Sequence, residues 1–82
     1  MNERDRLKLC IFMEDANTAE MQRIAGMDKH RFSKTLKEKI RLSSKELIEL
    51  ASYFPNYKYW IIFGEELPES GQISPMTKIK EK

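Results

Sequence analysis

The sequence predicts an all-α protein: one compact domain of five helices followed by a short polar tail. A chain of 82 residues holds one modest hydrophobic core. Apolar residues recur at three- and four-residue spacing in successive segments, and almost no segment shows the alternation of a strand. Residues suited to begin and end helices separate these segments. We therefore expect residues 1–66 to form the domain and residues 67–82 a loosely ordered tail.

The first two helices follow from apolar spacing and from their caps. Leu7 and Cys10 belong to an apolar stripe that predicts a helix over about residues 3–13. Asn17 can accept the free N–H groups at the start of a second, short helix. Gly26 suits the left-handed position that closes it.

The third helix has an unusually thin apolar stripe. Asp28 is a good N-cap, and its carboxylate favours the positive end of the helix dipole. Phe32 and Leu36 form one narrow apolar line, while the other faces are basic or polar. Such a helix is not built mainly to fill a core.

The fourth and fifth helices have clear boundaries. Ser43 and Glu46 form a capping box, and Pro55 stops the helix that it starts. The very apolar run at 57–63 predicts a short fifth helix, which Gly64 closes.

Charge is concentrated in one segment. The net charge is +2, yet residues 23–41 hold seven basic and two acidic side chains, a local charge of +5. Such a block points to a surface that faces a polyanion. A solvated helix face would carry the same residues, so charge alone leaves both interpretations open.

Several classes of protein are excluded. No apolar run approaches the ~20 residues that cross a bilayer, so we expect no membrane partner. The single cysteine, Cys10, cannot form an internal disulfide, which fits a reducing cytoplasm. One cysteine and one histidine leave no zinc set, and a Cys10–His30 pair has no third group to orient it. We expect no catalysis, no cofactor, no metal and no small-molecule ligand.

Two runs resemble a known family. The run NTAEMQRIAGMDKHRFSK at residues 17–34 resembles the helix-turn-helix of the lambda-repressor-like family, which includes the phage Cro-type proteins. The run WIIFGE at residues 60–65 is similar to the W-L-L-x-G-E ending of that family's fifth helix. The resemblance covers about residues 3–66. It implies a compact five-helix domain that binds operator DNA, usually as a dimer.

The resemblance also implies roles for single residues. The candidate DNA contacts are Thr18, Lys29, His30, Arg31, Ser33, Lys34, Lys37, Lys39 and Arg41. Thr18 would touch a phosphate, and Lys29, His30 and Ser33 would sit nearest the base edges. Lys34 would reach a guanine or a phosphate, and the other four would contact phosphates.

Two positions depart from the family pattern. Gln22 stands where the family usually has alanine, because the two helices approach closely there. Thr35 stands where the family has a bulky apolar residue. Leu36 is the candidate to take over that packing, which would rotate the helix slightly.

The fifth helix is more apolar than one face of a small domain can bury. Exposed apolar patches often mark partners. We expect a symmetric dimer interface formed by Tyr57, Tyr59, Ile62 and Phe63.

The sequence thus favours a small cytoplasmic transcriptional regulator from a bacterium or phage, a repressor that binds double-stranded operator DNA as a homodimer. The alternative is a protein-interaction module that keeps the fold but binds another regulator in place of DNA.

Overall fold

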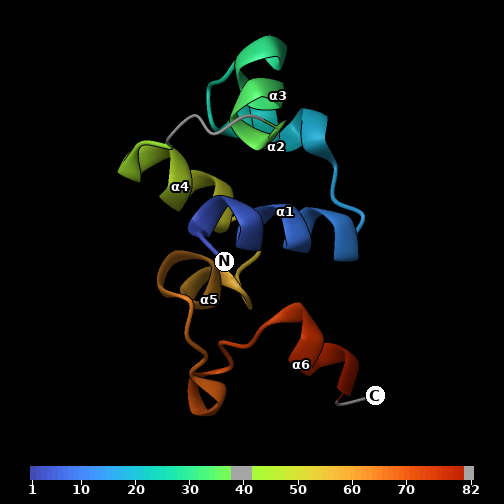
Figure 1. Cartoon of the computed structure of the whole chain (residues 1–82), viewed down its shortest axis with the longest axis vertical. Helices are drawn as coiled ribbons and strands as arrows, with labels where there is room; N and C mark the ends of the chain where they lie inside the picture. The colour runs from blue at the N-terminus through green and yellow to red at the C-terminus, as the bar shows by residue number, and fades with distance from the viewer. Residues whose placement is uncertain (38–41, 81–82) are drawn as a thin grey trace.

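The computed structural model describes residues 1–37 and 42–80 (Figure 1). Within these ranges the chain forms six α-helices and one 3-10 helix, and its only β-pairing is an isolated bridge between Leu67 and Gln72. The elements are α1 (Glu3–Met13), α2 (Thr18–Ile24), α3 (Lys29–Lys37), α4 (Ser44–Ala51), α5 (Lys58–Phe63), η1 (Pro68–Ser70) and α6 (Pro75–Lys80). The predicted all-α class is confirmed.

Helices α2, α3 and α4 begin at the predicted caps. Asn17, Asp28 and Ser43 each accept, through a side-chain oxygen, the backbone N–H three residues further on, at 2.7 to 3.2 Å. Glu46 completes the capping box of α4, because its Oε1 accepts the backbone N–H of Ser43 at 3.1 Å. Gly26, after α2, has a φ of +67°, the left-handed conformation expected of it.

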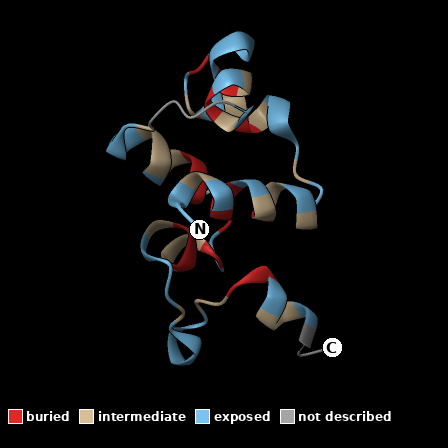
Figure 2. Cartoon of the chain, in the orientation of Figure 1, coloured by how far each residue is buried: buried red, intermediate tan, exposed pale blue. Residues whose placement is uncertain are grey.

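The core lies where α1, α4 and α5 meet, in the middle of the molecule (Figure 2). Leu7 and Cys10 of α1 pack there with Leu50 of α4 and Ile61 of α5, all of them 1% exposed or less. Burial, with a smaller contribution from the charge of Glu14, raises the pKa of Cys10 to about 12. The thiol therefore stays protonated at neutral pH and packs as a small hydrophobic side chain.

The expectation of a loosely ordered tail over residues 67–82 is wrong for the part that the structure describes. Residues 67–80 form η1 and α6, and α6 packs against α1. Gln72 accepts the backbone N–H of Tyr59 and donates to the carbonyl of Pro55, both at 3.0 Å. The side chain of Gln72 thus bonds the backbone of the domain.

Glu14 ties this C-terminal segment to the core. Its Oε1 accepts a hydrogen bond from the hydroxyl of Tyr57 at 3.1 Å and from Nζ of Lys78 in α6, also at 3.1 Å. One carboxylate oxygen thus joins the end of α1, the start of α5 and α6.

A buried arginine joins α1 to the end of α5. Nε of Arg6 donates to the carbonyl oxygen of Ile61 at 2.9 Å, and Nη1 donates to that of Met1 at 2.7 Å. The C-terminal carbonyls of a helix carry partial negative charge, which favours the guanidinium there. Gly64 leaves room for it, because a Cβ at that position would lie 3.1 Å from Nη1 of Arg6.

We expect Gly64→Ala to destabilise the protein more than Gly71→Ala. Both glycines have similar left-handed conformations, with φ of +76° and +75°, so both alanines incur the same backbone cost of about 1–2 kcal/mol. Only the alanine at Gly64 also displaces Arg6, whose charged hydrogen bonds are worth roughly 1.5–3 kcal/mol each. Urea unfolding followed by circular dichroism measures both losses, and equal losses would contradict the role given to Arg6.

Candidate functional site

Helices α2 and α3 form one end of the molecule, away from α6 and the C-terminus (Figure 1). The turn between them is short: the N–H of Gly26 donates to the carbonyl of Arg23, and that of Met27 donates to the carbonyl of Gln22, both at 3.1 Å. Met21, Met27 and Phe32 are buried and belong to the core. These three residues attach α2 and α3 to the core, and most other side chains of the two helices are polar.

The inward face of α3 is formed by Phe32 and Thr35, which are 6% and 1% exposed. Leu36 is only half-buried, so the expectation that it would take over the packing at Thr35 is wrong. Phe32 shares a helical face with both Thr35 and Leu36, three and four residues further on, and the core covers the Thr35 side of that face more completely.

An open groove of about 640 Å³ runs between α2 and α3. Its lining residues are Thr18, Ala19, Gln22, Lys29, Phe32, Ser33, Leu36 and Lys37. Four of the candidate contacts from the sequence, Thr18, Lys29, Ser33 and Lys37, are thus brought together. Gln22 also lines this groove, so it occupies space beside the helix crossing and is not enclosed within it.

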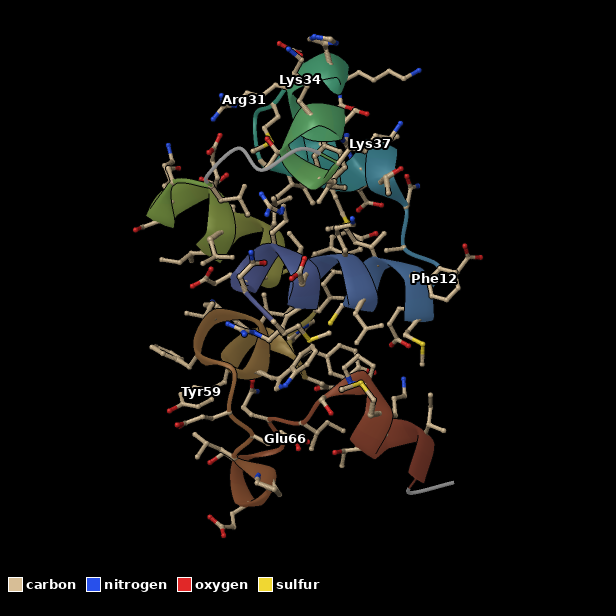
Figure 3. The ribbon with its side chains drawn as sticks, in the orientation of Figure 1. Phe12, Arg31, Lys34, Lys37, Tyr59 and Glu66 are labelled. Atoms are coloured by element: carbon tan, nitrogen blue, oxygen red, sulfur yellow. The ribbon has the colours of Figure 1, made fainter. Side chains whose placement is uncertain are left out.

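The remaining candidates on α3 that the structure describes are His30, Arg31 and Lys34, and all three are exposed. Figure 3 shows Lys34 and Lys37 at the end of the molecule remote from Tyr59. We call Lys29, Lys34 and Lys37 the basic face of α3. Lys39 and Arg41 lie outside the described residues.

Arg31, which the sequence predicts as a phosphate contact, is paired with Glu46 of α4 in the structure. Its Nε donates to Oε2 of Glu46 at 3.1 Å, and its Nη2 donates to Oε2 at 2.8 Å and to Oε1 at 3.0 Å. Partial burial alone would raise the pKa of Glu46, but hydrogen bonds from Arg31 and Ser43 outweigh it and lower that pKa. The carboxylate is therefore ionised at neutral pH, and the pair ties α3 to α4.

The predicted interface on α5 is only partly exposed. Tyr57 is 2% exposed and its hydroxyl is bonded to Glu14, so the assignment of Tyr57 to an exposed interface is wrong. The other three predicted residues remain accessible: Tyr59 and Ile62 are half-buried and Phe63 is 63% exposed. The rings of Tyr59 and Phe63 lie 4.7 Å apart.

We call Tyr59, Ile62 and Phe63 the α5 patch. Together with Lys58 and Gln72 they line a shallow hollow of about 270 Å³. Gln72 comes from the segment that the sequence suggested was a tail, so sequence reasoning missed its part in this surface.

Across residues 1–37 and 42–80, no group of three or more His, Cys, Asp or Glu side chains is placed to hold a metal ion. No helix in the part of the chain that the structure describes is long and apolar enough to cross a membrane.

Fold and site together define a small all-α protein that carries a basic, grooved helix pair at one end. The solved structure of Pf6r, from the filamentous phage Pf6 of Pseudomonas aeruginosa PA01, is similar to it. The two chains are 31% identical over 99% of this chain and 94% of the Pf6r chain, with a TM-score of 0.80. The chain belongs to the same family as Pf6r. No protein-family model matches the chain, and no curated protein matches it.

We expect Thr35→Val to stabilise the protein by about 1 kcal/mol. Oγ1 of Thr35 is the buried side-chain polar atom, among the described residues, that lacks a hydrogen-bond partner, and such a group costs roughly 1–3 kcal/mol. Valine has the same branched shape without the hydroxyl. Thr77→Val is the matched control, because the Thr77 hydroxyl contacts that of Ser74 at 3.3 Å and its loss should destabilise. Thermal unfolding distinguishes the two signs, and destabilisation by Thr35→Val would show that its hydroxyl is bonded.

Proposed function

We propose that the chain is a sequence-specific DNA-binding transcriptional regulator of the lambda-repressor-like type. In this proposal α2 and α3 are its helix-turn-helix, and α3 is the recognition helix that enters the major groove. The observation that carries the proposal is the basic face of α3, whose three lysines project from the end of the molecule beside an open groove. Kinship with a protein of a filamentous phage supports a phage or bacterial setting.

The geometry suggests which of these side chains would contact bases and which would contact phosphates. His30 and Lys34 project from the middle of the outward face of α3, where base edges would lie. Thr18 and Lys37 border the groove, whose polar and basic rim suits the phosphates of one strand. Regulation would follow from occupancy, because a bound protein excludes others from the same DNA without any covalent step, cofactor or small-molecule ligand.

The proposed assembly is a homodimer formed through the α5 patch. An exposed phenylalanine beside a half-buried tyrosine and isoleucine is costly to leave in water. A two-fold axis through this patch would pair identical surfaces and present two copies of α3 to one DNA duplex. Recognition helices about 34 Å apart would match one turn of DNA.

We expect the affinity for DNA to fall steeply as salt rises. If each subunit neutralises roughly four to six phosphates, the log–log slope of affinity against salt should be about −4 to −5 per subunit. Gel-shift or anisotropy titrations with genomic fragments, at several salt concentrations, measure it. Failure to bind any fragment at low salt would overturn the proposal and favour the protein-interaction module.

Lys34→Ala and Lys29→Ala should each reduce the ratio of the affinity for a selected DNA sequence to the affinity for random DNA. A base contact carries about 1–3 kcal/mol of discrimination, whereas a phosphate contact affects all sequences alike. Lys8→Ala on α1 is the control, because Lys8 is an exposed lysine outside the α2–α3 pair and its loss removes the same charge. Paired titrations on a selected and a random duplex give the ratio; an equal loss of ratio with all three alanines would place the base contacts elsewhere.

Phe63→Glu should convert the dimer to a monomer at micromolar concentration, because it places a charge in the centre of the α5 patch. Phe12→Glu is the matched control: Phe12 is 81% exposed and, as Figure 3 shows, lies far from Tyr59 at the end of α1. Sedimentation velocity measures both. A wild-type protein that stays monomeric, alone and on DNA, would remove the dimer from the proposal.

A further inference from the structure

The contact between Arg31 and Glu46 is more elaborate than most surface ion pairs. Three N–O distances between 2.8 and 3.1 Å join the two side chains, so both oxygens of the carboxylate accept from the guanidinium. Isolated surface pairs contribute about 0–1 kcal/mol, whereas a two-pronged arginine–carboxylate contact has defined geometry and adds specificity. The Glu46 side chain is only 16% exposed, which limits screening by solvent.

Glu46 is itself held in place. Its backbone N–H donates to Oγ of Ser43, and its carboxylate accepts the N–H of Ser43 in return. The same carboxylate therefore joins the first turn of α4 to the first turn of α3. Its position is determined by α4, so the position of Arg31 follows from α4 as well.

Helix α3 has few other attachments on its own length. Phe32 and Thr35 are its two buried residues, and the half-buried Leu36 packs against the core beside them. A short helix held only by this apolar line can still rotate about its axis unless a contact off that line prevents the motion. Arg31 lies to the α4 side of that line, and Figure 3 places its label on that side of α3.

We propose that Glu46 is a positioning residue for DNA recognition: by clamping Arg31 it fixes the rotation of α3, and Arg31 serves this clamp and not a phosphate. This inference rests on the proposed DNA-binding function. It assigns to an acidic residue a favourable effect on the binding of a polyanion.

The direction in which DNA affinity changes when Glu46 loses its charge distinguishes a positioning role from simple charge repulsion. Removing a negative charge near a DNA-binding surface should by itself strengthen binding, because the carboxylate repels phosphates. If Glu46 positions α3, its removal should weaken binding instead. Glutamine keeps the capping box of α4, since Gln at this position can still accept the N–H of Ser43.

The test compares Glu46→Gln with Glu49→Gln on a duplex selected from a random library by the wild-type protein. Glu49 lies one turn further along α4 and its carboxylate is 3.9 Å from Nζ of Lys45, so its substitution removes the same charge without touching α3. Fluorescence anisotropy should show Glu46→Gln binding roughly tenfold more weakly than wild type, equivalent to about 1.4 kcal/mol. Glu49→Gln should bind as tightly as wild type or more tightly.

Arg31→Lys supplies an independent measurement. A clamp needs the two-pronged guanidinium, so lysine should weaken binding while the salt slope stays at its wild-type value. A phosphate contact needs only the charge, so lysine would then bind nearly as well as arginine, and Arg31→Gln would reduce the slope by about 0.9. Circular dichroism melts establish a temperature at which every variant is folded.

The outcomes are distinguishable. Wild-type protein that binds no DNA would overturn the proposed function, and the inference with it. Wild-type protein that binds, together with Glu46→Gln binding at least as tightly as Glu49→Gln, would overturn the inference alone. Full affinity of Arg31→Lys would do the same, while partial recovery in the charge-reversed double variant Arg31→Glu with Glu46→Arg, relative to Arg31→Glu, would support it.

Discussion

The buried guanidinium of Arg6 is the constraint on which the arrangement of the helices depends. A charge taken out of water must find hydrogen-bond acceptors, and Arg6 finds them in the carbonyls of Met1 and Ile61. These bonds fix α1 against the end of α5, and they require that Gly64 carry no side chain. With α1 and α5 joined, α4 packs against both and the core is closed. Helices α2 and α4 are in contact on one side of this three-helix centre, and α6 packs against α1.

Helix α3 contributes few residues to the core, and this explains why most of its surface is polar or charged. Phe32 and Thr35 are its buried residues, so the rest of its surface is open to solvent and to partners. A helix attached so narrowly needs polar contacts to define its orientation. Asp28 caps its start, and Glu46 holds Arg31 on one side. Among the residues that the structure describes, these two carboxylates are the acidic groups bonded to α3, and the lysines on its outward face are exposed.

The features that sequence reasoning predicted are local, and those it missed join distant residues. Asn17 and Ser43 bond N–H groups three residues away, so a short stretch of sequence is sufficient to predict these helix starts. Tyr57 is buried and bonded to Glu14, 43 residues away in the chain, so no local pattern separates it from the exposed residues of α5. The sequence predicts Glu46 as half of a capping box, but its bond to α3 crosses between helices and leaves no local signal. Gln22 stands out in the sequence as larger than the alanine usual in the family, and this does not predict the groove beside it.

The C-terminal segment shows why polar composition is a weak guide to disorder. Gln72 uses both ends of its amide, one on the N–H of Tyr59 and one on the carbonyl of Pro55, and so fixes the loop that leads into α5. The N–H of Ile73 donates to the carbonyl of Asn56 at 2.9 Å and holds the same loop. The bond to Tyr59 satisfies one of the backbone N–H groups that a short helix without a side-chain cap leaves open. Gln72 also lines the hollow beside the α5 patch. The part of the chain that reads as an appendage is therefore a component of the proposed assembly surface.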